Sequence, residues 1–444
     1  MKQGGYPLIT RSRLSKERMP VQYTFIDTIG LLVLCALLIV QPFHFAMTER
    51  LTYYREIFAV TFSLLIIHNL LKYFLKYQIG LSMRPEVFYI FLSLFTLIFF
   101  ALFDPGVNLY GFDATETSEN LLNVNLTLYV LRNALLYIPM VCYLALRGLS
   151  EKELKLLAGI VALVAPFSIV AFLYDIEFLP SKNIMDIVSL GGYGLQRNTY
   201  VSYLTFPFIA SLYLVVELRI KIFKLSFLAV ELFIFLYMMV SGCRQGMIFC
   251  IFMTLLMLMC VPTKNKAIKC LLFIIACSVI FMVANYYATS EYNVHDVIEV
   301  RYSSVAGFFD TGGREEIIKD GLGLLNVQEY LVGAGLSSVI ISGPHNDFIR
   351  WTQRIGIPGM VLSFLPFFLS ALHVFRYMQR KKKRPMLLFI LSALFFTIYH
   401  SCFGYPREDA YQALYAFLGL ALWLAISKSE PISNHKMHTY LHSR

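Results

Sequence analysis

Residues 24–43 read TFIDTIGLLVLCALLIVQPF, and Asp27 is the only charged side chain among them. An α-helix of this length and hydrophobicity can cross the hydrocarbon core of a bilayer. Similar apolar runs recur along the 444-residue chain, which is 58% hydrophobic and only 15% charged. A soluble chain of this size carries about 25% charged residues. The sequence therefore predicts an all-α, polytopic membrane protein.

The apolar runs predict about twelve transmembrane helices and one large loop. The predicted spans are 24–43, 57–75, 86–103, 125–146, 154–174, 199–217, 225–241, 244–261, 268–287, 355–375, 386–402 and 410–427. They divide the chain into a cytoplasmic N-terminal segment 1–23, nine helices over 24–287, an outward-facing loop 288–354, three helices over 355–427 and a cytoplasmic tail 428–444. The loop contains an amphipathic stretch from Arg314 to Leu325, so short helices are expected within it.

The positions of Lys and Arg predict the orientation of these spans. With the N-terminus in the cytoplasm, every inner connector is basic, and the inner segments hold 26 of the 38 Lys and Arg residues. This is the distribution that the positive-inside rule requires of a membrane protein. Topology thus explains the net charge of +10, and nucleic acid is not expected as a partner.

The twelve basic residues left over are mostly arginines on the outer side. A guanidinium group binds phosphate or carboxylate in bidentate fashion, so an anionic ligand is expected at this face. The alternative is that each arginine pairs with a nearby acidic side chain. Arg132 and Glu231 lie within predicted spans, and one interpretation pairs them with each other.

Three outer motifs combine glycine, arginine or histidine. The turn from Ser241 to Gly246 places Arg244 at the start of a predicted helix, where a cation is ordinarily disfavoured and an anion is welcome. Gly312-Gly313-Arg314 opens the amphipathic stretch in the same way and is followed by Gly333-Ala334-Gly335. In the third motif, His345 stands at a helix start and is a candidate general base. The structural alternatives are arginines that reach the membrane interface and a buried, satisfied histidine.

The third motif resembles a known family pattern. His345-Asn346, nine residues and then Gly356-Ile357-Pro358-Gly359 is similar to the His-(Asn/Ser/Gln)-x9-Gly-x-x-(Gly/Thr/Tyr) pattern of the bacterial O-antigen ligase and O-antigen polymerase superfamily. The first motif resembles that family's Ser-x-Ser-Arg-Gly turn, with Cys243 in place of the second serine and Gln245 inserted before the glycine. Gly313-Arg314 resembles the arginine that opens the family's periplasmic loop helix. The motifs cover residues from about 190 to 360.

The resemblance implies a metal-independent membrane glycosyltransferase with no cofactor. Its donor would be an undecaprenyl-diphosphate-linked glycan bound at the periplasmic face. The resemblance and the charges together assign catalytic roles to His345, Arg244 and Arg314. The side chains expected to bind substrate are Arg197, Arg301, Asn346 and Arg350. His400, near the outer end of a predicted span, is a weaker candidate for a cavity residue.

Three functions remain open at this stage. The first is polymerisation of surface-polysaccharide repeat units, favoured narrowly because the arginine turn departs from the ligase-like pattern. The second is ligation of the finished glycan to lipid A core, and the third is a polysaccharide transporter or flippase. A chain-length regulator is a further expected partner besides the bilayer, the donor and the acceptor. The sequence does not reveal the sugar, the linkage, the oligomeric state or whether Cys243 and Cys402 form a disulfide bridge.

Overall fold

The structure is a computed structural model in which all regular secondary structure of the described residues is helical. It describes residues 25–43, 54–75, 85–102, 131–132, 135–177, 197–240, 244–260, 265, 271, 273, 275, 279, 316, 319, 322–323, 325–336, 346–380, 384–402 and 413–429. Its helices are α1 (Phe25–Phe43), α2 (Tyr54–Leu75), α3 (Pro85–Leu102), α5 (Ile138–Arg147), α6 (Glu151–Glu177), α8 (Arg197–Glu217), α9 (Lys221–Val240), α10 (Arg244–Cys260), α15 (Val327–Val332), α16 (Asp347–Arg380), α17 (Arg384–Ser401) and α18 (Ala413–Ser429). The predicted all-α class is confirmed.

Four stretches are long and apolar enough to cross a membrane: Phe25–Phe43, Tyr54–Leu71, Glu151–Ala171 and Asp347–Gln379. Further apolar helices of the described part, α10, α17 and α18 among them, are shorter. Exposed apolar stripes support the same interpretation. On α2 the exposed side chains recur every three or four residues: Ile57, Val60, Leu64, Ile67 and Leu71. A continuous apolar face of this kind is unfavourable in water and suits contact with lipid.

The predicted span 125–146 is not one continuous helix in the structure. Residues 131–132 are helical, a turn follows at Leu136 and Tyr137, and α5 begins only at Ile138. Pro139 lies in the first turn of α5. Proline has no backbone N–H to donate, so it suits a helix start and interrupts a helix that would otherwise run through it. α5 alone is too short to cross a bilayer.

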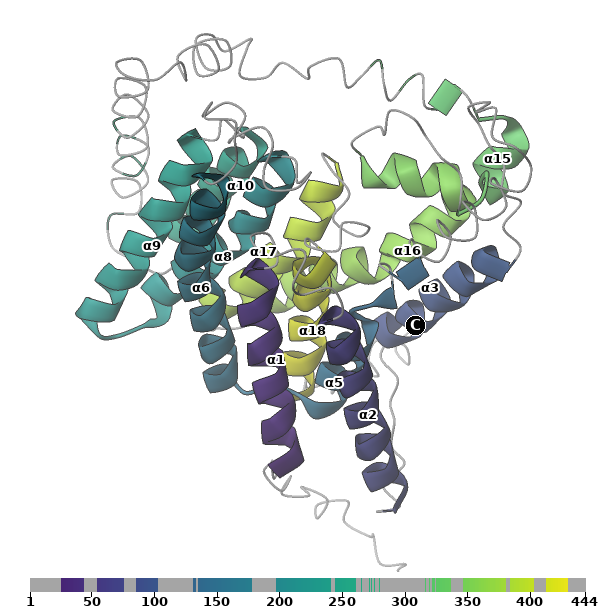
Figure 1. Ribbon diagram of the computed structural model, residues 1–444, viewed down its shortest axis with the longest axis horizontal. Coiled ribbons are helices and arrows are strands. Elements are labelled where there is room, and N and C mark those ends of the chain that lie inside the picture. The colour runs from purple at the N-terminus through teal and green to yellow at the C-terminus, as the bar shows by residue number, and fades with distance from the viewer. Residues whose placement is uncertain are drawn as a thin grey trace, which may run out of the picture.

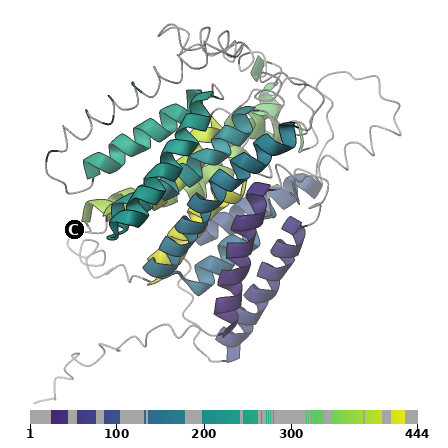
Figure 2. The same ribbon diagram turned by 60° about the vertical axis from the view of Figure 1, so that its left-hand side comes forward.

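Helix α18 forms the centre of the bundle, because all of its side chains from Ala413 to Ile426 are buried. It contacts α5, α16 and α17, and Figure 1 shows it in the middle of the molecule. The ring of Tyr415 stacks on Tyr203 and Phe206 of α8, with centroid separations of 4.6 and 4.4 Å. A helix that is apolar on all sides requires such an interior position. Helices α1 and α2 lie side by side and contact each other (Figure 2).

The predicted pair of Arg132 with Glu231 is wrong. Arg132 forms an ion pair with Glu56 of α2, so one outer arginine follows the alternative of pairing with a nearby acid. Glu231 is buried in α9, and no ion pair joins it to any residue that the structure describes. Hydropathy placed both charges within spans but could not show which helix packs against which.

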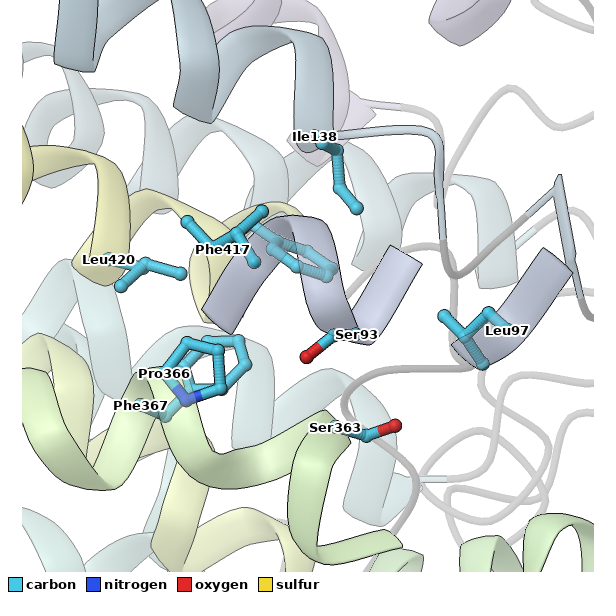
Figure 3. Close-up of a pocket in the computed structure, with 9 residues that line it drawn as sticks. Ser93, Leu97, Ile138, Ser363, Pro366, Phe367, Phe417 and Leu420 are labelled. Atoms are coloured by element: carbon cyan, nitrogen blue, oxygen red, sulfur yellow. The ribbon is translucent and has the colours of Figure 1, made fainter. Parts of the chain in front are cut away.

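A proline and a serine fix the crossing of α3 on α16. Pro366 cannot donate a backbone hydrogen bond, so the carbonyl of Leu362 loses its partner within α16. The hydroxyl of Ser93 in α3 reaches this carbonyl at 2.6 Å and also lies 2.8 Å from the carbonyl of Tyr89 in its own helix. The close-up in Figure 3 shows Ser93, Ser363 and Pro366 around a small pocket whose other lining residues are apolar.

Candidate active site

The helix that follows His345 begins with a side-chain cap. His345 itself lies outside the described residues, and Asn346 is the first described residue of α16's start. The Oδ1 of Asn346 accepts a hydrogen bond from the N–H of Ile349 at 3.2 Å, which is the geometry of an N-cap. Asp347 in the first turn is fully buried and acidic, as the helix dipole favours. Asn346, expected to bind substrate, thus uses its amide oxygen to start the helix.

The nine-residue spacer of the family pattern corresponds to one short helical segment. It runs from Asp347 to Ile355 and ends at Gly356, whose φ of 70° and ψ of 173° break α16. A Cβ at position 356 would lie 2.2 Å from the carbonyl oxygen of Leu331. Gly333 has a φ of 79° and lies equally close to the segment before Gly356, because a Cβ there would lie 2.2 Å from the carbonyl oxygen of Arg354. The two glycine motifs therefore pack backbone against backbone.

The break in α16 frees carbonyl groups that the Gly333–Gly335 segment satisfies. The N–H of Ala334 donates to the carbonyl of Gln353 at 2.7 Å, and the N–H of Gly335 donates to that of Arg354 at 3.1 Å. The preceding helix α15 has a capping box, in which Asn326 and Glu329 each accept the other's backbone N–H. The Asn346 cap holds the start of the segment that follows His345, and the bonds from Ala334 and Gly335 hold its end.

The last turn of α17 contacts both the histidine motif and the arginine turn. The Nδ2 of Asn346 donates to the carbonyl of Cys402 at 3.3 Å. Tyr399, three residues earlier, donates its hydroxyl to the carbonyl of Gln245 at 2.9 Å. The residues next to His345 and Arg244 in the sequence are therefore joined through one helix end. Cys402 is a free cysteine in the structure.

Helix α8 reaches the same place. The Nε2 of Gln245 donates to the hydroxyl of Ser202 at 2.8 Å, and α8 begins five residues before Ser202, at Arg197. Helix α10 begins at Arg244. The first turns of α8, α10 and α16 thus lie around the end of α17. Helix N-termini carry partial positive charge, so this end of the bundle favours an anion.

The predicted site residues divide into those whose backbone is described and those that are not. Arg197 and Arg244 open helices, and Arg350 is a half-buried residue of α16's first turns. His345, Arg301 and Arg314 lie outside the described residues. Of the other outer arginines, Arg354 is 1% exposed, so its guanidinium group belongs to the protein interior.

Sequence reasoning missed the residues that connect the motifs. Gln245 was noted only as an insertion into the family turn, whereas it contacts both α8 and α17. His400 was a candidate cavity residue but is fully buried, 3.0 Å from the hydroxyl of Thr205. The sequence feature that indicates these connecting residues is the clustering of polar residues at the outer ends of otherwise apolar helices. Among the residues described, no group of three His, Cys, Asp or Glu could hold a metal ion.

Comparison with known proteins bears on the same region. Residues 228–364 match the family model Wzy_C, described as O-antigen ligase. We call residues 228–364 the Wzy_C segment. This match confirms the resemblance to the O-antigen ligase and O-antigen polymerase superfamily. No curated protein matches the chain.

The Wzy_C segment runs from α9 to the second part of α16, so it contains Arg244, His345 and the break at Gly356. Helices α8 and α17 lie outside it. They nevertheless supply Ser202 and Tyr399, which hold the first turn of α10. The candidate site therefore includes the Wzy_C segment and residues from helices on both sides of it in the sequence.

Proposed function

We propose that this protein is a membrane glycosyltransferase that polymerises the repeat units of a surface polysaccharide. Its substrates are undecaprenyl-diphosphate-linked oligosaccharides at the periplasmic face of the inner membrane. One observation carries the proposal: Gln245 and Asn346 both hydrogen-bond the last turn of α17, at Tyr399 and Cys402. This supports a site in which Arg244 and His345 act on the same substrate.

In the proposed reaction His345 takes the proton from an acceptor hydroxyl. The hydroxyl oxygen attacks the anomeric carbon of the donor glycan, and the bond from that carbon to the diphosphate oxygen breaks. Undecaprenyl diphosphate leaves with the bonding electron pair. Arg244 and Arg314 stabilise the negative charge that develops on the leaving oxygens, as fixed cations do in a site poor in water. The guanidinium groups make a metal ion unnecessary in this scheme.

Arg197, Arg301 and Arg350 complete the proposal as contacts to the donor. Asn346 then has two roles. It caps α16, and beside His345 in the sequence it is also proposed to bind the substrate. The membrane arrangement proposed with this function has about twelve spans, a periplasmic loop over 288–354 and both ends in the cytoplasm. In this arrangement residues 1–23 and 428–444 are cytoplasmic, and the transmembrane helices lie within 24–287 and 355–427.

Ligation of the glycan to lipid A core is the second candidate. The description of the matched family model as O-antigen ligase favours it. Gln245, which has no counterpart in the family's arginine turn, favours polymerisation instead. The two reactions use the same donor and differ in the acceptor alone. A chain-length regulator would be a partner of the polymerase only.

The test uses purified protein with the radiolabelled lipid-linked glycan isolated from source cells that lack this protein. Polymerisation produces a ladder of longer lipid-linked glycans, and ligation produces labelled product only when lipid A core is added. His345→Ala is expected to lower the rate by about 10²–10⁴-fold, and Arg244→Ala by about 10²–10³-fold. Both variants are compared with the wild type at equal concentrations of purified protein.

Two control variants remove the same types of side chain, an arginine and a histidine, at positions outside the candidate site. Arg219→Ala removes an exposed arginine from the connector between α8 and α9, and His442→Ala removes a histidine from the predicted cytoplasmic tail. Both are expected to keep wild-type rates. Binding of undecaprenyl diphosphate without sugar is measured in parallel and should weaken in Arg244→Ala only. A His345→Ala protein with wild-type transfer would remove this residue from the mechanism.

A further inference from the structure

Two hydrogen bonds tie the first turn of α10 to its neighbours. Gln245, directly after Arg244, donates from its side-chain nitrogen to the hydroxyl of Ser202 in α8 at 2.8 Å. Its backbone carbonyl accepts the hydroxyl of Tyr399 in α17 at 2.9 Å. One residue thus contacts two other helices, through its side chain on one side and its backbone on the other.

A second pair of bonds lies beside the first, one within α8 and one from α8 to α17. The hydroxyl of Thr205 lies 2.7 Å from the carbonyl of Ser202 and 3.0 Å from the Nε2 of His400. A hydroxyl group has one proton to donate, and the carbonyl can only accept it. The Thr205 oxygen must therefore accept, and the Nε2 of His400 carries the proton that it accepts. His400 follows Tyr399 in the sequence, so the two pairs of bonds form a closed circuit.

The part of this circuit formed by Ser202, Thr205 and His400 lies in an apolar interior, whereas Gln245 and Tyr399 are half-buried. Ser202, Thr205 and His400 are each 2% exposed or less, and the ring centroids of Phe396 and Phe249 lie 4.7 and 5.4 Å from that of His400. Apolar side chains of similar size would pack here without the cost of burying polar groups. The polar residues therefore require a reason other than stability.

The polar atoms are also incompletely satisfied. The Nδ1 of His400, the Oε1 of Gln245 and the hydroxyl of Ser401 have no hydrogen-bond partner among the described residues. A buried network with unmet partners is less stable than an apolar core of the same shape. All three residues lie where α10 begins and α17 ends, which is the place that the proposed reaction requires to be rigid.

We infer that Ser202, Thr205, Gln245, Tyr399 and His400 form a positioning network that fixes the start of α10, and with it Arg244, relative to the α17 end that also contacts Asn346. The inference rests on the proposed function. The network touches neither donor nor acceptor, and it acts through the placement of the guanidinium group on the leaving diphosphate. Displacement of a catalytic group by about 1 Å is expected to lower the rate by about 10²-fold.

The first test compares two buried threonines in the purified, full-length protein. Thr205→Val removes the acceptor for His400, whereas Thr254→Val removes a buried hydroxyl that bonds the carbonyl of Cys250 in its own helix. Thr205→Val is expected to lower kcat by about 10–100-fold with the donor KM changed by less than about threefold. Thr254→Val should keep the wild-type kcat. Equal losses in both variants would reduce the network to a structural role.

The second test restores the donor group at position 400. His400→Phe removes the hydrogen bond to Thr205 and fills the space between the rings, while His400→Gln places an amide nitrogen near the former Nε2. His400→Gln is expected to recover at least about a third of the wild-type kcat, and His400→Phe is expected to behave like Thr205→Val. A phenylalanine variant with wild-type kcat would overturn the inference.

The third test asks whether the network acts through Arg244. Gln245→Leu is measured in the wild-type and in the Arg244→Lys background, because a residue that acts through another loses its effect once that other is changed. The expected loss of kcat is about 10–100-fold in the first background and less than about threefold in the second. Equal losses would refute the coupling. Absence of transfer by the wild-type protein would refute the proposed function and the inference with it.

Discussion

The residue at position 356 decides where the helical segment after His345 ends. Glycine adopts its φ of 70° without strain, whereas a residue with a Cβ rarely does. The carbonyl of Leu331 also occupies the space that a side chain would need. The family pattern requires glycine here and Asn, Ser or Gln after the histidine. Both requirements now have physical reasons, because Asn346 caps the segment and Gly356 breaks it.

Gly356→Ala is therefore expected to destabilise the protein. The backbone conformation alone costs a residue with a side chain about 1–3 kcal/mol, and the contact with the Leu331 carbonyl adds to this cost. Thermal unfolding in detergent should show a lower Tm, together with slower glycan transfer. The control is Gly323→Ala, because a Cβ there meets no atom within 4 Å. Equal Tm values for the two variants would contradict the backbone packing at Gly333 and Gly356.

Single residues were predicted unequally well. The position of Arg244 at a helix start followed from the sequence, since Gly242 and Gly246 flank it between apolar runs. The partner of Arg132 did not, because the choice between Glu56 and Glu231 depends on which helices pack together. The role of Gln245 was also hidden, because Ser202 and Tyr399 are far from it in the sequence.

At the scale of whole helices, one buried arginine joins α1, α5 and α6. Arg147 ends α5, and its guanidinium group donates to the carbonyls of Asp27 and Gly148 at 3.0 Å each. Its third contact is an ion pair of 2.5 Å with Glu153. Glu153 and Ser150 form a reciprocal cap at the start of α6. Arg147 was counted among the inner charges that set the topology, yet its side chain is only 2% exposed.

Glu153→Ala is expected to cost about 3–5 kcal/mol, because it leaves the guanidinium group of Arg147 buried without its anion. Chemical unfolding in detergent or protein abundance in the membrane measures the loss. The matched control is Glu151→Ala in the same turn, which breaks a part-exposed pair with Lys155 that is worth about 0–1 kcal/mol. A Glu153→Ala protein as stable as the control would show that the ion pair is not needed.

Most predicted spans overlap a helix because hydrophobic length and helix length coincide in membranes. The exception at 125–146 has a local cause in Pro139. At 355–375 the hydropathy pattern found the part of α16 after the break but not the part from Asp347 to Ile355. That segment carries polar residues, among them Gln353 and Arg354, which are buried by protein instead of lipid.

For the molecule as a whole, the sequence predicted the fold class and the motifs, but not how the motifs meet. The meeting depends on α8 and α17, which lie outside the Wzy_C segment and bring Ser202, Tyr399 and Cys402 to it. Such contacts are set by the packing of helices that lie 43 to 154 residues apart in the sequence, and local sequence patterns do not predict them.

Orientation is the property of the whole molecule on which the proposed site depends. The positive connectors predict that the loop around α15 lies outside and the connector between α8 and α9 inside. Single cysteines at Val327 (79% exposed) and Ile220 (56% exposed), in a protein without native cysteines, test this in spheroplasts. A membrane-impermeant maleimide should label position 327 alone, and permeabilisation should add position 220. Labelling of position 220 in intact spheroplasts would place the arginine and histidine motifs in the cytoplasm, where a periplasmic glycan could not reach them.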